Sequence, residues 1–264
     1  MNTFKRYFIE IAFNGTAYHG WQVQQNAVSV QEILNKALSV ILRQNIETTG
    51  CGRTDTGVHA TQLFAHFDLQ EEVQPTTHKP QPTTYNFQAS LNSLLPYEIA
   101  VRRIIEVADN AHARFDAVKR SYQYYIHFEK DPFRFGLSWL LRDKPDMELM
   151  NKAALIIMEY QDFSCFSKSN TQTFTNNCHI TKAEWQNVDG GMIFYISADR
   201  FLRNMVRAIV GTLIQVGRKE ISPEEVRKII LSKNRSNAGA SVPACGLYLT
   251  SVEYPSRLKI RKME

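Results

Sequence analysis

Near its N-terminus the chain reads Tyr7-Phe8-Ile9-Glu10-Ile11-Ala12-Phe13, with a large apolar residue at every odd-numbered position. This period of two is typical of a β-strand with one buried face, and it predicts a strand over residues 7–14. Farther along, Ser29-Val30-Gln31-Glu32 has the form of a helix capping box, and apolar residues recur after it at helical spacing. We therefore predict a helix over about 30–43, so that the chain combines strands with helices.

The same patterns predict the remaining elements and an α+β fold. Strands are expected near 63–69, 99–107, 120–128, 179–188, 192–199 and 246–254, and helices near 147–159, 200–216 and 223–232. The last helix is marked by Ser222-Pro223-Glu224-Glu225, which supplies a cap, a first-turn proline and acidic residues. Residues 70–88 show no period and are expected to form a long surface loop, either a mobile insertion or part of a binding surface.

We expect two similar strand-and-helix halves whose mainly antiparallel sheets meet at a central basic cleft. The N-terminal α+β domain is predicted to span residues 1–107 and to carry the glycine-rich loop at 50–60. The C-terminal α+β domain is predicted to span 108–264 and to complete the cleft. Ligand sites favour junctions between domains, which is why the cleft is the expected place for a site.

The composition favours a soluble protein that works without a bound metal. The chain has 264 residues, of which 44% are hydrophobic, and no apolar run approaches the roughly 20 residues that a membrane span requires. We therefore expect a cytoplasmic protein with no membrane contact. The four cysteines lack C-x-x-C spacing, and the seven histidines lack the spacing of paired metal ligands, so reduced thiols and no metal site are expected.

The net charge of +5 is moderate and does not by itself require a nucleic-acid partner. The positions of the basic residues are more informative about a binding partner than the net charge. Clusters such as Arg102-Arg103, Lys119-Arg120 and Arg200/Arg203/Arg207 adjoin strands rich in aromatic residues. Phosphate contacts beside stacking rings are typical of nucleic-acid-binding surfaces.

The densest group of glycine and polar residues is Gly50-Cys51-Gly52-Arg53-Thr54-Asp55-Thr56-Gly57-Val58-His59-Ala60. Glycine permits positive φ angles and close approach of another molecule to the backbone. From the residues alone, Asp55 could form a structural Asx-turn or belong to an active site, and both interpretations stay open.

This loop closely resembles the catalytic loop of the TruA family of bacterial tRNA pseudouridine synthases. Other segments resemble family motifs in the family's order: Leu91-Asn92-Ser93-Leu94-Leu95-Pro96, Ala113-Arg114-Phe115, Arg120-x-Tyr122-x-Tyr124, Phe201-Leu202-x-x-Met205-Val206-Arg207-x-Ile209-Val210-Gly211 and Pro243-Ala244-x-Gly246-Leu247. Several motifs in one order, from about residue 5 to residue 254, are far more specific than one short pattern. Two departures are Thr56, where the family usually has alanine, and the longer loop at 70–88.

The resemblance implies an isomerase that converts uridine to pseudouridine at positions 38 to 40 of the tRNA anticodon stem-loop, as a homodimer and without a cofactor. It assigns the catalytic carboxylate to Asp55, as a nucleophile or as a group that stabilises the sugar intermediate. Arg207 would pair with Asp55 and keep it ionised, and Tyr122 would stack on the target base. Tyr124, on the same face of the strand, is expected to be structural.

Arg53, Arg203 and Leu247 complete the predicted substrate-binding residues. Arg53 would contact the RNA backbone or fill the space that a flipped base vacates. On a helix over 200–216, Arg203 and Arg207 would lie with Arg200 on one line beside the apolar stripe, although solvated arginines bordering a core helix have the same spacing.

Two other classes of function fit part of the pattern. A non-catalytic RNA-binding protein built from RRM-like sheets would need the basic and aromatic strands but not Asp55. A hydrolase could use Asp55 and His59 as an acid–base pair and would release a product, whereas isomerisation leaves the mass of the RNA unchanged. His59 is expected instead to fix the loop by hydrogen bonding.

Overall fold

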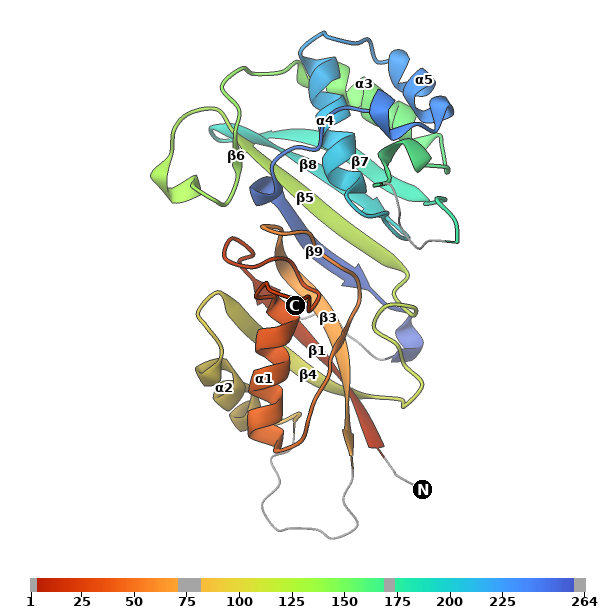
Figure 1. Cartoon of the computed structure of the whole chain (residues 1–264). Coiled ribbons are helices and arrows are strands. Elements are labelled where there is room, and N and C mark those ends of the chain that lie inside the picture. Colours follow the sequence, from red (N-terminus) through yellow and green to blue (C-terminus); the bar gives the residue numbers. More distant parts are fainter. Residues whose placement is uncertain (1–3, 71–81, 169–173, 259–264) are drawn as a thin grey trace. The chain divides into compact units, whose positions relative to one another are not determined.

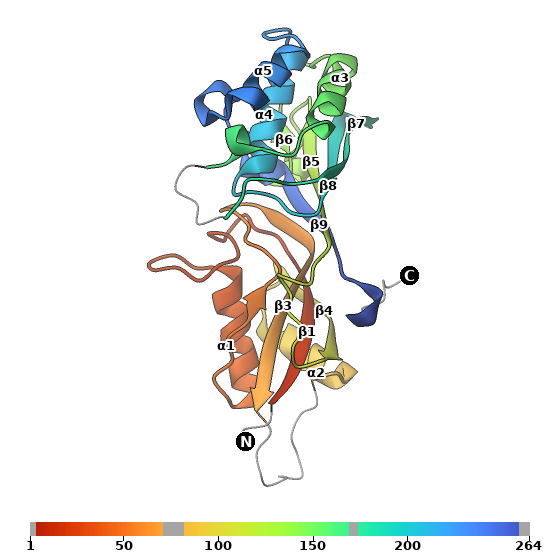
Figure 2. The ribbon, with the colours of Figure 1, turned by 90° about the vertical axis from the view of Figure 1, so that its right-hand side faces the viewer.

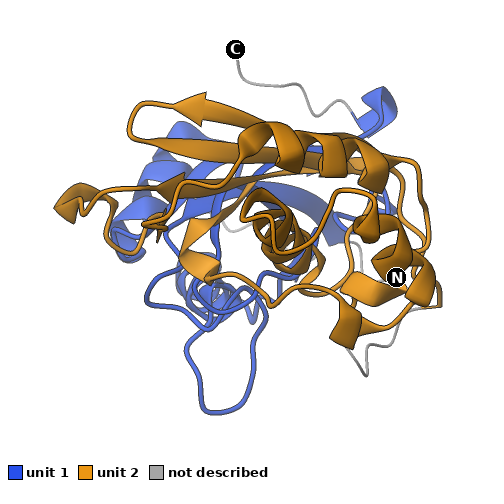
Figure 3. Cartoon of the chain, turned by 90° about the horizontal axis from the view of Figure 1, so that it is seen from above, with its two compact units in different colours: residues 1–118, 250–264 blue, residues 119–249 orange. Residues whose placement is uncertain are grey.

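The computed structural model describes residues 4–70, 82–168 and 174–258. The chain forms two compact units: unit 1 contains residues 1–118 and 250–264, and unit 2 contains residues 119–249 (Figure 3). This division differs from the predicted boundary at 107/108, because residues 108–118 stay with the first unit and the C-terminal segment returns to it. Val118 donates its N–H to Glu253 O at 2.8 Å, and Tyr254 Oη donates to Ala113 O at 2.6 Å.

Unit 1 contains an antiparallel sheet with the strand order β4-β1-β3 (Figure 1). Its strands are β1 (Phe4–Phe13), β3 (His59–Gln70) and β4 (Ile99–Val107), and the short β2 (Thr49–Gly50) pairs with β3. The prediction of one buried face for the first strand is wrong, because β1 is central and has Phe8 and Ile9 both 0% exposed. Glu10 is also buried and pairs with Arg103 on β4.

Two helices accompany this sheet and contact each other. In α1 (Val30–Leu42) the predicted cap is present, since Ser29 Oγ accepts from the Glu32 N–H at 3.3 Å. Helix α2 (Tyr85–Leu94) has no counterpart among the predicted elements, so the loop prediction is wrong for residues 85–88, while residues 71–81 lie outside the described part. Thr84 caps α2, whose buried residues are Phe87 and Leu91. Only two buried positions in ten residues leave a weak helical period.

Unit 2 contains an antiparallel sheet with the order β5-β8-β7 and helices on one side of it (Figure 2). The strands are β5 (Lys119–His127), β7 (Ile180–Val188) and β8 (Gly191–Ala198), with β6 (Trp139–Leu140) parallel to β5. The helices are α3 (Met147–Met158), α4 (Met205–Gly217) and α5 (Glu225–Ser232). The last strand, β9 (Leu247–Glu253), begins in unit 2 and ends in unit 1.

Helix α4 begins at Met205, five residues after the predicted start at 200. Asn204 before it has a φ of 65°, in the left-handed region, so the backbone cannot continue as a right-handed helix through this residue. Arg200 and Arg203 therefore lie outside α4, and the predicted line of three arginines on one helix is wrong. Among the three, only Arg207 belongs to the helix.

The predicted α+β class is confirmed. The strands pair mainly antiparallel, and five α-helices occur within the described ranges. None of the helices in those ranges is both long and apolar enough to cross a membrane.

Candidate active site

Asp55 lies in a tight turn between β2 and β3. Val58 N–H donates to Asp55 O at 3.1 Å, which closes the four-residue turn from Asp55 to Val58. Gly57 occupies its third position with a φ of 77°, a backbone conformation that residues with a side chain rarely adopt. The half-buried Asp55 is therefore positioned by a closed backbone turn.

The segment 15–21 packs against this turn and fixes it from outside. Gly57 N–H donates to Tyr18 O at 3.2 Å, and Trp21 N–H donates to Thr54 O at 3.4 Å. At Gly20, where φ is +83°, a Cβ atom would lie 2.2 Å from Thr54 O, so only glycine permits this approach. Segment 15–21 is not part of the predicted site. Its two glycines, Gly15 and Gly20, are the local sequence feature that could have indicated its close contact with the turn.

His59 fixes the end of the loop by a hydrogen bond, as predicted. Gly15 N–H donates to His59 Nδ1 at 3.0 Å, and the histidine is 1% exposed. An Nδ1 that accepts a hydrogen bond belongs to a neutral ring protonated on Nε2. The ring thus holds the backbone, which favours a structural role over an acid–base role.

The loop has both exposed and buried side chains. Arg53 and Thr56 are exposed, whereas Cys51 and Val58 are 1% exposed. A Cβ atom at Gly52 would meet no atom within 4 Å, so there is open space beside the loop. The loop surface is therefore open at Gly52, next to the exposed Arg53.

In unit 2, Arg207 is bound to the segment that precedes β9. Its Nε donates to Val242 O at 2.7 Å, and Val242 N–H donates to Arg207 O at 3.3 Å. One turn farther along α4, a Cβ atom at Gly211 would lie 1.9 Å from Ala240 O. Because the segment lies directly on the helix, the direction of the Arg207 side chain is restricted.

The same segment is bound to β5 through Tyr124, which is structural as predicted. Tyr124 is 0% exposed, its Oη donates to Pro243 O at 2.8 Å, and burial raises its pKa. A Cβ atom at Gly246 would lie 2.7 Å from Tyr124 Cζ, so the two elements are in close contact. Leu247 follows and is 6% exposed, so this packing determines its place.

Tyr122 lies on β5 opposite Ile196 and is half-buried. Its ring meets the ring of Phe201 edge-on, with centroids 5.1 Å apart and an interplanar angle of 88°. Phe201 is not among the predicted site residues, although it is the first residue of the family-like motif that contains Arg207. The aromatic pair gives Tyr122 a defined orientation.

The structure thus brings the predicted residues together in two groups, one in each unit. Arg53, Asp55 and His59 share one loop of unit 1, and Tyr122, Arg207 and Leu247 belong to the packed β5, α4 and β9 elements of unit 2. Arg203 belongs to neither packed group: it is exposed, and its backbone O accepts from the Lys168 N–H at 3.2 Å.

The described part of the chain contains no group of three or more His, Cys, Asp or Glu side chains that could hold a metal ion. All four cysteines are free thiols.

Comparisons with known proteins agree on one family. The sequence pattern described as tRNA pseudouridine synthase matches residues 160–255. A protein named tRNA pseudouridine synthase A from Porphyromonas gingivalis is 49% identical over 255 residues, which cover 96% of this chain and 98% of that protein. A protein of the same name from Bacteroides thetaiotaomicron is 48% identical over 254 residues, which cover 95% of this chain and 91% of that protein. Another, from Azobacteroides pseudotrichonymphae, is 47% identical over 251 residues, which cover 95% of this chain and 97% of that protein.

Proposed function

The chain belongs to the tRNA pseudouridine synthase A family, and on that premise we propose that it forms pseudouridine at positions 38 to 40 of the tRNA anticodon stem-loop. It is an isomerase that acts on uridine in tRNA. The observation in the structure that supports a catalytic loop here is the position of Asp55 in a closed turn of a loop that has open space at Gly52.

The reaction exchanges one bond for another within a single nucleotide. The bond between N1 of uracil and C1′ of ribose breaks, and a bond between C5 and C1′ forms. The hydrogen on C5 leaves as a proton and N1 gains one, so the mass of the RNA is constant and no oxidant or second substrate is consumed. The base must leave the stack to turn, which costs a few kcal/mol.

We assign the catalytic carboxylate to Asp55. A carboxylate beside the flipped nucleotide can form a covalent intermediate or stabilise positive charge on the sugar. Its closed turn, bound by Tyr18 and Trp21, holds the residue before the substrate arrives. Positioning of this kind lowers the entropic part of the barrier.

We assign the other residues to the substrate nucleotide and its phosphates. Tyr122 would stack on the flipped uracil, and Leu247 would contact it as an apolar surface. Arg207 would orient the Asp55 carboxylate, using its terminal Nη atoms because its Nε donates to Val242 O. Arg53 and Arg203, both exposed, would contact RNA phosphates. These roles require that residues of both units meet one nucleotide, in a basic cleft.

We further propose that the protein is a cytoplasmic homodimer, as its family resemblance implies. Light scattering coupled to gel filtration measures the mass of the particle in solution and so tests the dimer directly. A mass near 61 kDa would support the dimer, since one chain has a mass of 30.4 kDa and twice that is 60.8 kDa. A mass near that of one chain would exclude it.

The function is tested by incubating the purified protein with unmodified tRNA transcripts and mapping pseudouridine by carbodiimide-dependent stops in reverse transcription. We expect stops at positions 38 to 40 where the transcript has uridine, and none when cytidine replaces it. Stops only elsewhere in the tRNA would refute the positional assignment. A released base would indicate a hydrolase, and binding without any product would indicate a non-catalytic RNA-binding protein.

Matched variants test the catalytic residue in the same assay. Asp55→Asn keeps the size of the side chain and removes its charge, and we expect no product. Asp109→Asn makes the same change at an exposed aspartate of the same unit, and we expect full activity.

A further inference from the structure

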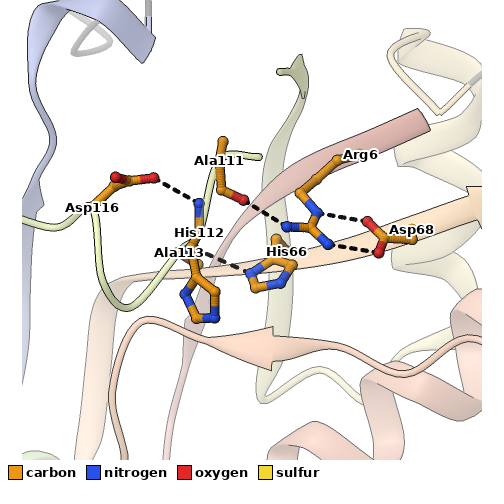
Figure 4. A network of polar contacts seen from close by, with 7 residues as sticks. All are labelled: Arg6, His66, Asp68, Ala111, His112, Ala113 and Asp116. Atoms are coloured by element: carbon orange, nitrogen blue, oxygen red, sulfur yellow. Dashed lines mark hydrogen bonds and ion pairs between the residues drawn. The ribbon is translucent and has the colours of Figure 1, made fainter. Parts of the chain in front are cut away.

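A surface turn of unit 1, residues 111–116, is fixed by side chains from distant parts of the chain (Figure 4). From β1, Arg6 donates to Ala111 O at 2.9 Å while it pairs with Asp68 through two hydrogen bonds of 2.7 Å. From β3, His66 Nδ1 accepts from the Ala113 N–H at 3.2 Å. From the C-terminal segment, Tyr254 Oη donates to Ala113 O at 2.6 Å.

The turn also binds its own backbone. His112 N–H donates to Asp116 Oδ2 at 2.7 Å, and His112 Nδ1 accepts from the N–H groups of Arg114 and Phe115 at 3.1 and 3.3 Å. The N–H groups of residues 112 to 115 thus all donate to side chains, two of them to one ring. A turn held in this way has a single backbone conformation.

This rigid turn carries an exposed aromatic ring. Phe115 is 75% exposed, although its ring lies 4.3 Å from the ring of His112, which in turn lies 4.6 Å from the buried ring of His66. The exposed Arg114 places its Cζ 5.7 Å from the centre of the Phe115 ring. A row of rings therefore runs from the sheet to the surface and ends in a phenylalanine beside a guanidinium.

We propose that Phe115 and Arg114 form a preformed contact for the tRNA substrate, outside the catalytic loop. Phe115 stacks on an unpaired or helix-terminal nucleobase, and Arg114 contacts a phosphate next to it. This proposal rests on the proposed function, because it requires that tRNA is the substrate.

The chemistry of the pair suits RNA better than a protein partner. Every nucleobase offers an aromatic face, and each is followed along the strand by a phosphate, so one ring and one cation match one nucleotide. A protein interface needs a larger continuous apolar patch, and the neighbouring exposed residues here are mostly polar. Because the turn is already fixed, binding requires little further ordering of the protein.

The test compares tRNA affinity and steady-state kinetics of the full-length protein and its variants. Phe115→Leu keeps an apolar side chain against His112 but removes the aromatic face. We expect its Kd and KM for tRNA to rise by about 5- to 150-fold, with kcat at saturating tRNA unchanged. Phe115→Tyr keeps the ring and should bind within about twofold of the parent. Arg114→Gln should lower the slope of log affinity against log salt by about 0.7–0.9.

Two control variants remove an exposed ring and an exposed charge elsewhere in unit 1. Tyr97→Leu removes a ring that is 102% exposed, and Arg43→Gln removes an exposed charge at the end of α1. Both should leave Kd and KM unchanged. Thermal unfolding of each variant checks that the fold is intact, and Phe115→Leu should melt within a few degrees of the parent.

Three results would decide against the contact. The proposal is overturned if Phe115→Leu binds tRNA as tightly as the parent, if its kcat falls while KM stays constant, or if Tyr97→Leu weakens binding equally. A failure of the proposed function is separate and visible in the parent protein, which would then form no pseudouridine.

Discussion

Acid should destabilise unit 1 through His66. This histidine is 6% exposed, and burial, followed by the nearby charges of Arg6 and His112, lowers its pKa from 6.5 to about 4. The folded state therefore keeps the ring neutral, with Nδ1 accepting from the Ala113 N–H at 3.2 Å. The unfolded chain binds a proton at this site at pH values where the folded chain does not.

The sign and size of the effect follow from proton linkage. The folded pKa lies below the unfolded one, so the contribution of His66 is fully present above about pH 6.5 and is lost as the pH falls towards 4. With these two values, the free energy of unfolding drops by about 2 kcal/mol between pH 7.5 and pH 5. The pKa of His112 is lowered in the same direction, chiefly by burial, and adds to the loss.

The measurement is urea unfolding at both pH values for the parent and for His66→Asn. Asparagine never takes up a proton in this range, and its Oδ1 can accept from the Ala113 N–H in place of Nδ1. We expect the variant to be less stable than the parent at pH 7.5 but to lose about 2 kcal/mol less on acidification. Effects of the carboxylates are shared by both proteins and cancel in the comparison.

An exposed histidine supplies the control. His179 is exposed in unit 2, and His179→Asn should follow the pH dependence of the parent. Equal losses on acidification in the parent and in His66→Asn would show that His66 is not held neutral by the fold, and the reasoning from its burial would be wrong.

Four further outcomes are expected. Asp55→Asn should abolish pseudouridine formation and leave the Kd for tRNA within several-fold, because phosphate contacts supply most of the affinity; substantial turnover would contradict the assignment. Tyr122→Ala should lower kcat/KM by about 5- to 150-fold, because the stacking of its ring on the base is lost. Tyr122→Phe keeps the ring and should therefore keep more activity than Tyr122→Ala. Equal inactivity of the two variants would assign proton transfer to the tyrosine hydroxyl. Gly20→Ala should destabilise the protein by about 1–3 kcal/mol in urea unfolding, since φ at Gly20 is +83° and the new Cβ would lie 2.2 Å from Thr54 O. Gly52→Ala is the control: its new Cβ would meet no atom within 4 Å, so the free energy of unfolding should change by less than about 1 kcal/mol. Arg200→Ala should weaken tRNA binding and lower the salt slope by about 0.7–0.9, and an unchanged slope would place this residue outside the RNA path.

Local patterns were sufficient for most helices and strands. The strand 99–107 coincides with β4, and the helix at 30–43 agrees with α1 to one residue, because the Ser29 cap and the spacing of apolar residues act within one turn. Helix α2 was missed because its two buried residues leave little period to detect. The start of α4 was misplaced because a left-handed Asn204 leaves the apolar spacing on either side unchanged.

The candidate site was predictable where its residues are adjacent in sequence. The loop from Gly50 to Ala60 carries Arg53, Asp55 and His59 within one motif, and its resemblance to a known family supplied the chemistry. The contacts that hold this loop come from elsewhere: Gly15 reaches His59 across 44 positions, and Tyr18 and Trp21 bind the turn through backbone atoms that no side-chain pattern reveals.

The sequence by itself determined the α+β class, the family and the residues around Asp55, because all of these are expressed in local spacing and in side-chain identity. Only the tertiary structure decided that β1 buries both faces, that Arg200 and Arg203 lie before the start of α4, and that residues 111–116 form a fixed turn. That turn depends on Arg6, 105 positions from Ala111, and on His66, 47 positions from Ala113. Hydrogen bonds over such separations exist only after the chain has folded, since nothing in the order of residues brings these partners together.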